Sequence, residues 1–390
     1  MKPQSRTFVS ERIATAPSSG IRRLFDLVAS MEDVISLGVG EPDFATPAPI
    51  LRAGIAALEG GATHYTPNAG LMVLRQAIAG HLERLYGVSY DPASEILLTV
   101  GVSEALYVAC VATLDPGDEV IIPEPCYFSY IPVVTFAGGT AVTVPTSAEH
   151  GWQATTAQIE AAITARTKAI LLNHPCNPTG AVLGREWLEQ IADLARRYDL
   201  LVISDEVYDR LVYGVEHVCF PVLPEMRSRT ILLQGFSKSY AMTGWRLGYA
   251  AAPAEILGMM HKVHQYAIMC VPTVAQHAAL AALQEGEPHV AAMRAEYDRR
   301  RRLIVDGLSE MGLTCAEPQG AFYAFPSVAV TGMDDEEFAE RLLREERVVV
   351  APGRVFGPSG QGHVRCSYAT SREKIEQALE RMRRFVDRYG

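Results

Sequence analysis

One lysine in the middle of the chain has the surroundings that an amine nucleophile needs. Lys238 follows the apolar run Thr230–Gln234 and precedes a segment of small residues, in the stretch GFSKSYAMTGWRLG. Partial removal from water lowers the pKa of a lysine and frees its amine for bonding to a carbonyl carbon. Arg246, eight residues later, can hold a phosphate with its forked guanidinium. A lone lysine is ordinarily a solvated surface group, so the prediction depends on the whole stretch.

Two neighbouring carboxylates end another apolar run. Asp205 and Glu206 follow Leu200–Ser204, which has the composition of a buried strand. A carboxylate in such a place needs a partner, and the protonated nitrogen of a pyridine cofactor would keep that ring an electron sink. We assign this role to Asp205, although Glu206 is equally acidic and the pair could lie at the surface. Tyr208 could share a phenolate oxygen of the same ring with an amide donor.

A rigid loop could supply that amide. Residues 173–180, NHPCNPTG, come directly after the apolar run Lys168–Leu172. Ligands of open α/β sheets bind at this end of the strands. Asn177 can donate an amide N–H to a phenolate oxygen, whereas a purely structural turn is the simpler interpretation of the same residues.

A helix start could bind an anion. In GVSEAL, residues 101–106, Gly101 permits a tight turn and Ser103 is expected to be the N-cap. The free N–H groups of Val102 and Ser103 would then face outward at the positive end of the helix, where a phosphate binds well. A plain capped helix is the alternative.

A second candidate anion-binding group lies near the C-terminus. Arg365, in HVRCSYATS, is flanked by Val364, Cys366 and Tyr368, which predicts a half-buried guanidinium. Such an arginine pairs with a carboxylate through two hydrogen bonds. The carboxylate could belong to a substrate or to an internal aspartate.

The elements around these residues predict an α/β architecture. Short β-branched runs alternate with helical patterns such as Ser103–Leu114 and Arg185–Tyr198, which indicates a mostly parallel sheet covered on both faces. The predicted strands are Ile96–Val100, Glu119–Ile122, Ala141–Val144, Lys168–Leu172, Leu200–Ser204, Thr230–Gln234 and Leu247–Ala251.

The last third of the chain has a different pattern. A long Arg-rich helix is expected at 288–312, followed by helices near Asp334–Glu346 and Ser371–Arg388. Short strands between them indicate a smaller α+β domain, at Ala321–Phe325, Val348–Val350 and Val364–Ser367. With 390 residues, two domains are expected. We place the large domain at 46–280, and the small domain at 281–390 together with an N-terminal arm, 1–45.

Composition excludes several classes of protein. A net charge of −10 argues against nucleic-acid binding, and the chain has neither an apolar signal-peptide core nor an 18-residue apolar stretch. Seven scattered cysteines without a C-x-x-C predict reduced thiols and a cytoplasmic protein. His261 and His264 share a helix face, but nothing nearby completes a zinc site, so no metal is expected.

The motifs together resemble the class I/II aminotransferases of pyridoxal-5′-phosphate (PLP) fold-type I. The resemblance covers nearly the whole chain, and the stretch around Lys238 matches the attachment-site pattern of that family. Eight segments follow one another in the family's order: SLGVGEPDF, HYTPNAG, GVSEAL, PCYFSY, NPTG, SDEVY, SKSYAMTGWRLG and VRCSYA. The resemblance implies a large α/β/α domain with a mostly parallel seven-stranded sheet, plus a small α+β domain.

The resemblance also assigns roles to residues. Lys238, Asp205 and Tyr208 would be the catalytic residues. Tyr127 would stack on the cofactor ring, and Tyr65 would reach the phosphate bound in a neighbouring subunit, which implies a homodimer with shared active sites. The full cofactor-binding set is Lys238, Gly101, Val102, Ser103, Tyr127, Asn177, Asp205, Tyr208, Ser237, Arg246 and Tyr65. The substrate would be held by Gly40, Asn177 and Arg365.

The sequence departs from the family pattern in three places. Many relatives have a small residue in place of Val102 and a serine in place of Gly235, so altered phosphate contacts are expected. Arg354 stands where small or polar residues are common and is a candidate to touch the substrate side chain. The segment 18–44 resembles a subgroup of archaeal aromatic aminotransferases and bacterial diaminopimelate-pathway enzymes, which leaves aromatic, acidic and diaminopimelate-type substrates open.

The expected activity is transfer of an amino group from an L-amino acid to a 2-oxo acid such as 2-oxoglutarate, by a ping-pong mechanism. Lys238 would act as general base and then as general acid. A PLP-dependent C–S β-lyase is the alternative within the same fold, because fold does not fix function. A PLP-binding regulator or sensor is the alternative of another class, but the N-terminal 45 residues are too short and not basic enough for a DNA-binding domain.

Overall fold

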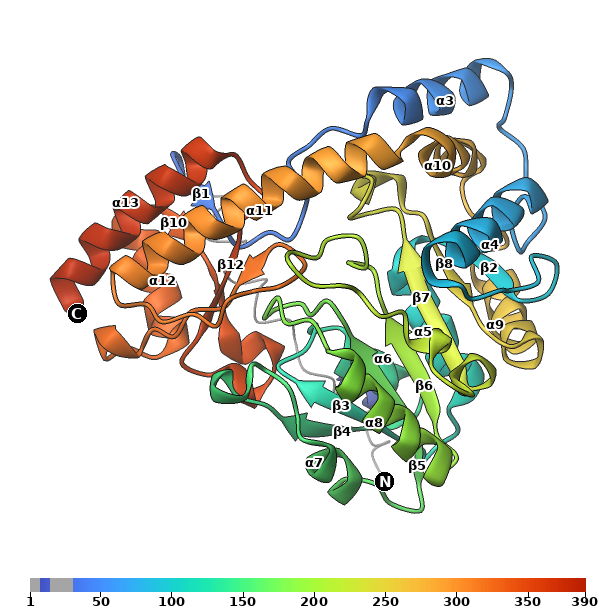
Figure 1. Ribbon diagram of the computed structural model, residues 1–390, viewed down its shortest axis with the longest axis horizontal. Coiled ribbons are helices and arrows are strands. Elements are labelled where there is room, and N and C mark those ends of the chain that lie inside the picture. Colours follow the sequence, from blue (N-terminus) through green and yellow to red (C-terminus); the bar gives the residue numbers. More distant parts are fainter. Residues whose placement is uncertain (1–7, 15–30) are drawn as a thin grey trace, which may run out of the picture.

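A seven-stranded sheet forms the centre of the molecule (Figure 1). The computed structural model describes residues 8–14 and 31–390. The strand order is β2-β8-β7-β6-β5-β3-β4; β8 is antiparallel to both neighbours and all other pairs are parallel. The strands are β2 (Ile96–Thr99), β3 (Glu119–Glu124), β4 (Thr140–Pro145), β5 (Thr167–Asn173), β6 (Leu201–Asp205), β7 (Thr230–Gly235) and β8 (Gly248–Ala251). The predicted mostly parallel sheet is confirmed.

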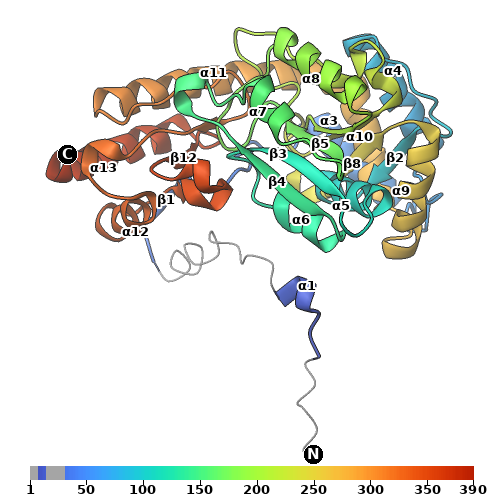
Figure 2. The ribbon, with the colours of Figure 1, turned by 90° about the horizontal axis from the view of Figure 1, so that it is seen from below.

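Helices cover both faces of this sheet, and Figure 2 shows α7 and α8 on one side and α5 and α6 on the other. Successive strand residues point to opposite faces: Val202 packs with α8, whereas Ile203 packs with α5. Both sides are therefore apolar, as in parallel sheets generally. The helices of this part are α3 (Ala48–Glu59), α4 (Met72–Tyr86), α5 (Gly101–Thr113), α6 (Tyr130–Phe136), α7 (Thr156–Ala161), α8 (Arg185–Arg197), α9 (Ala254–Ala267) and α10 (Thr273–Glu285).

The last third of the chain forms an α+β unit beside the sheet. The long helix α11 runs from α10 to the region of α12 and α13 (Figure 1). Two small sheets complete the unit, one with the order β11-β12-β9 and one pairing β1 with β10. The elements are α11 (Glu287–Glu310), β9 (Tyr323–Ala324), α12 (Asp335–Glu346), β10 (Val348–Val349), β11 (Ala351–Pro352), β12 (Val364–Ser367), α13 (Arg372–Tyr389) and, from the N-terminal side, β1 (Ile35–Ser36).

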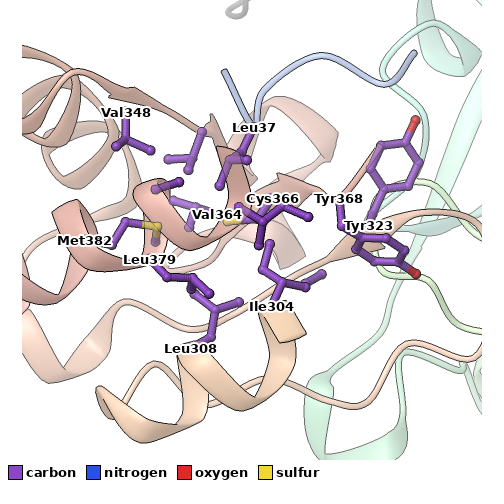
Figure 3. Packing of buried hydrophobic residues seen from close by; sticks show 14 of the residues in the cluster. Leu37, Ile304, Leu308, Tyr323, Val348, Val364, Cys366, Tyr368, Leu379 and Met382 are labelled. Carbon is purple, nitrogen blue, oxygen red and sulfur yellow. The ribbon is translucent and has the colours of Figure 1, made fainter. Parts of the chain in front are cut away.

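This unit has an apolar core of its own, shown in Figure 3. Leu308 of α11, Cys366 of β12 and Met382 of α13 meet there and are fully buried. Leu37 joins the same core from a position more than 260 residues earlier in the chain. Since β1 also pairs with β10, the segment that follows residue 30 packs with the C-terminal unit.

The predicted elements are found within about two residues of their expected ends, and the strand expected at Ala321–Phe325 is reduced to Tyr323–Ala324. The domain division at residues 45 and 280 stays a prediction. Much of the predicted N-terminal arm (1–7 and 15–30) lies outside the described residues, and the short helix α1 (Glu11–Ala14) lies near α6, away from the sheet (Figure 2). No helix among the described residues is long and apolar enough to cross a membrane. The seven cysteines are free thiols in the structure.

Candidate active site

A cavity of about 430 Å³ opens at the carboxyl end of the sheet, between the sheet and the C-terminal unit. This is the edge where ligands of open α/β sheets bind. The cavity gathers residues that lie up to 327 positions apart in the sequence. The predicted site residues that line it are Gly40, Val102, Ser103, Tyr127, Asn177, Asp205, Tyr208, Ser237, Lys238, Arg246 and Arg365.

The Lys238 amine lies inside this cavity. It follows β7 in a short turn, and its Nζ donates a hydrogen bond to the carbonyl oxygen of Gly40 at 2.7 Å. Burial, together with the positive charge of Arg365, lowers the pKa of Lys238 to about 8. The amine is therefore partly uncharged near neutral pH and fits the role of a nucleophile.

Asp205 and Glu206, which are equally acidic in the sequence, point to opposite sides of the sheet at the end of β6. Asp205 lines the cavity, where Tyr130 donates its hydroxyl to Oδ2 at 2.7 Å and the backbone N–H of Val207 reaches Oδ1 at 3.2 Å. Burial raises the pKa of Asp205 to about 6. No ion pair of Asp205 occurs within residues 8–14 and 31–390, and a cationic ring nitrogen in the cavity would give this buried carboxylate a charge partner.

Glu206 belongs to a different, closed cluster. Its Oε2 pairs with His217 at 2.7 Å, and its Oε1 accepts from Ser204 at 2.7 Å and from the Phe220 backbone at 2.9 Å. Although burial acts in the other direction, the neighbouring histidines hold the pKa of Glu206 below its usual range. Its hydrogen-bonding capacity is used within the protein, so Glu206 is not available to a ligand.

Arg365 is buried, with 4% of its surface exposed, and its hydrogen-bond partners among the described residues are neutral. Its guanidinium donates to Asn177 Oδ1 and to the carbonyl oxygen of Gly38, each at 2.7 Å, while its buried Nε has no partner among the described residues. The rings of Tyr323 and Phe356 lie 4.5 and 4.8 Å from the guanidinium carbon. The structure thus contains no internal aspartate on Arg365 in its described part, and the site fits an incoming carboxylate.

Glycines bring backbones together at the start of α5. A Cβ atom at Gly101 would lie 2.7 Å from Arg246 Nη2, and one at Gly248 would lie 2.7 Å from the Val102 backbone nitrogen. The guanidinium and the free N–H groups of the helix start therefore share one corner, which fits a phosphate. Val102 and Gly235, two of the three departures from the family pattern, are neighbours, because a Cβ at Gly235 would lie 3.1 Å from Val102 Cγ2.

The prediction of Ser103 as the N-cap is wrong. The helix begins at Gly101, its N-cap is Val100, and Ser103 lies within the first turn. Gly101 reverses the chain with a φ of +70°, so the helix can begin two residues earlier than expected. The Glu104 carboxylate accepts from the Val100 backbone N–H at 2.5 Å and so caps the helix start.

The position of Arg354 gives no support to the suggestion that it touches the substrate side chain. Arg354 does not line the cavity and is bound by the acidic start of α12. Its guanidinium lies 2.8 Å from the buried Asp335 and 2.9 Å from Glu336. Such a cluster of carboxylates at a helix N-terminus attracts a cation, which holds Arg354 away from the cavity.

Two other residues considered in the sequence analysis, Tyr65 and His264, do not line the cavity. Tyr65 lies outside the cavity and is 82% exposed, which leaves its side chain free to act on another subunit. His264 is buried and bonds to Glu104 at 2.6 Å, and no cluster of metal-ligating side chains occurs in residues 8–14 and 31–390.

Sequence reasoning assigned no role to Tyr130 or Tyr323, which both line the cavity. Tyr130 binds Asp205, and the Tyr323 hydroxyl lies 2.7 Å from that of Tyr208. Tyr130 stands within the PCYFSY segment, three residues after Tyr127, so it would lie on the same face of a helical turn. Tyr323 gave no such local signal.

Comparisons with known proteins agree with this geometry. The sequence model of the family "Aminotransferase class I and II" matches residues 32–382. The chain is 47% identical to the aspartate aminotransferase of Pyrococcus abyssi and 44% identical to aromatic-amino-acid aminotransferase 2 of Thermococcus litoralis, in each case over 97% of this chain and 98% of the relative. The crystal structure of an aromatic aminotransferase from Pyrococcus horikoshii superposes with a TM-score of 0.90 at 46% identity, over 94% of this chain and 99% of that one. The chain therefore belongs to the class I and II aminotransferases and is a transferase of amino groups.

Proposed function

We propose that this enzyme binds PLP covalently through Lys238 and transfers the amino group of an L-amino acid to a 2-oxo acid such as 2-oxoglutarate in two half-reactions. One observation carries the proposal: one cavity is lined by a lysine of lowered pKa, a buried aspartate of raised pKa and a buried arginine whose described hydrogen-bond partners are neutral. Perturbed groups of this kind cluster where catalysis requires them.

The residues of the cavity fit the cofactor group by group. Asp205 would bind the pyridine nitrogen, and Asn177 and Tyr208 would bind the ring oxygen. Tyr127 would lie against the ring. The phosphate would be held at the start of α5 and by Arg246, with Gly101, Val102, Ser103 and Ser237 around it. Bound PLP supplies an electron sink for the bond that breaks at the substrate α-carbon.

The remaining chemistry belongs to the protein. Arg365 would hold the substrate α-carboxylate beside Gly40, which fixes the α-carbon in front of Lys238. The Lys238 Nζ can then take the α-proton as general base and later release it as general acid. The aromatic rings around Arg365 exclude water from this ion pair and so strengthen it.

The amino acid preferred by this enzyme is left open among aromatic, acidic and diaminopimelate-type side chains. The two relatives above carry the names of aspartate and of aromatic amino-acid aminotransferases at similar identity. Residues that set the preference come from several segments of the cavity, and small changes in them alter specificity.

A homodimer is part of the proposal, with cytoplasmic location expected. Tyr65, Tyr266 and Met269 are exposed, and their segments lie side by side, since Asn68 donates to the Met269 carbonyl oxygen at 2.6 Å. Exposed apolar side chains gathered in this way are typical of subunit contacts.

Mixing inactive Tyr65→Ala and Lys238→Ala variants should restore activity, because one site of each heterodimer would be intact. Heterodimers without activity would contradict shared sites.

The direct test of the function uses the bound cofactor as its own indicator. A panel of amino acids, including phenylalanine, glutamate and alanine, is added without any 2-oxo acid. We expect at least one amino acid to bleach the absorbance of the lysine-bound cofactor, and 2-oxoglutarate to restore it. If none does, and cysteine conjugates instead yield pyruvate and ammonia, the C–S lyase function is correct.

A further inference from the structure

Two buried tyrosine hydroxyls meet at the edge of the cavity. The hydroxyls of Tyr208 and Tyr323 lie 2.7 Å apart, and the two residues are 3% and 1% exposed. Tyr208 follows β6 in the sheet part, whereas Tyr323 belongs to β9. In Figure 3, Tyr323 lies at the end of the apolar cluster opposite Val348 and Met382. Among the described residues, each hydroxyl has only the other as a hydrogen-bond partner.

Tyr323 also lies beside the other functional groups of the site. Its hydroxyl occupies the space beside Gly40, where a Cβ atom would lie only 2.1 Å from it. The Gly40 carbonyl in turn accepts from the Lys238 amine. The ring of Tyr323 lies 4.5 Å from the guanidinium carbon of Arg365. Tyr323 therefore contacts the segments that position the lysine, the arginine and Tyr208.

The hydrogen-bonding capacity of a phenol fixes the direction of the pair. A tyrosine hydroxyl donates one hydrogen bond and accepts others. If Tyr208 donates its one proton to the ring oxygen of the cofactor, the bond between the two tyrosines must be donated by Tyr323. A donor to Tyr208 polarises its O–H bond and strengthens the bond that Tyr208 makes.

We propose that Tyr323 is a positioning residue that orients the Tyr208 hydroxyl and strengthens its hydrogen bond to the cofactor ring oxygen, and so helps to set the proton affinity of the lysine-bound cofactor. This inference rests on the proposed function. A phenylalanine would fill the apolar space equally well, and a buried hydroxyl is costly unless it is bonded. The charged or titratable groups that face the pair are Lys238, Arg365, Asp205 and Tyr127.

The test is a pH titration of the absorbance of the bound cofactor in the holoenzyme. The ring oxygen is most negative when the neighbouring nitrogen, contributed by Lys238, has lost its proton, so a donor to this oxygen lowers the midpoint pH. Tyr323→Phe should raise the midpoint by about half a unit, because strengthening of one hydrogen bond by another is modest. Tyr208→Phe should raise it further, and Tyr323→Phe should add nothing in the Tyr208→Phe background.

Tyr213→Phe is the matched control. Tyr213 is also buried, and it donates its hydroxyl to the Ala321 carbonyl oxygen at 2.5 Å, outside the cavity. The Tyr213→Phe variant should lose thermal stability as Tyr323→Phe does, but its absorbance titration should keep the wild-type midpoint pH. The inference is overturned if Tyr323→Phe titrates like wild type, or if its shift is equally large with and without the Tyr208 hydroxyl. A wild-type protein that binds no PLP would instead contradict the proposed function.

Discussion

At the carboxyl end of β6, two adjacent carboxylates lie on opposite sides of the sheet and differ in how fully they are paired. On the cavity side, Asp205 has neutral hydrogen-bond donors, no bonded cation in the part of the chain that the structure describes, and a pKa raised to about 6 by burial. On the other side, Glu206 has His217 and Ser204 at 2.7 Å, and burial of His217 is outweighed by this carboxylate, so the pKa of His217 is raised. At the end of β6, the carboxylate of Asp205 is thus incompletely paired, whereas that of the next residue, Glu206, is completely paired.

Two of the three arginines that the sequence singled out show the same contrast. Arg365 is buried with neutral acceptors, whereas Arg354 is bound by a cluster of carboxylates. A buried charge without a charged partner costs stability, and a protein keeps such a group where a ligand completes it. Residues that act on ligands therefore have incomplete charge pairing within the protein, whereas residues that stabilise the fold are fully paired.

The carboxylate pair gives the largest expected effect. Asp205→Asn should lower kcat by about 10²–10³-fold with the fold retained, because an amide cannot stabilise a pyridinium. Glu206→Gln should keep kcat near wild type in the folded protein but lose about 3 kcal/mol of stability, since it breaks a buried ion pair. Steady-state kinetics of both variants measure kcat, and urea denaturation measures their free energies of unfolding. A reversed pattern would mean that the two roles are wrongly assigned.

The arginine pair comes next. Arg365→Ala should lower kcat/KM for amino acids by about a hundredfold, as roughly 3 kcal/mol of charge-assisted bonding to the α-carboxylate disappears. Arg354→Ala should leave kcat/KM close to wild type and lower only the melting temperature. If Arg354→Ala impairs kcat/KM as much as Arg365→Ala does, pairing with Asp335 does not keep Arg354 out of the reaction.

The smallest effect is a pH dependence of stability in the cofactor-free protein. The pKa of Asp205 rises from 3.8 to about 6 on folding, so the folded state holds an extra proton between these values. Its contribution to stability is present at low pH and is lost as the pH rises through about 6. Relative to Asp205→Asn, wild type should lose about 2 kcal/mol of unfolding free energy between about pH 4.5 and about pH 6.5. A flat or rising difference in urea denaturation would refute the raised pKa.

Local patterns in the sequence predicted the strands and several of the residues that line the cavity, because apolar runs and the ends of parallel strands define where a ligand lies. The family resemblance, not a local pattern, supplied Gly40, Tyr127 and Ser237. They could not decide between Asp205 and Glu206, since that choice depends on which face of the sheet each residue points to. The cap at Ser103 failed because the positive φ of Gly101 starts the helix earlier. The roles of Arg354 and Tyr323 depend on contacts with other segments of the chain, which the local sequence does not reveal.

The central claim is that Lys238 carries the cofactor, and covalent labelling tests it most directly. The holoenzyme is reduced with borohydride, digested, and the pyridoxyl-labelled peptide is identified by mass spectrometry. The pKa of about 8 and the place of Lys238 in the cavity predict a single label on that residue. Lys238→Ala should take up none. A label on another lysine of the wild-type protein would contradict the account.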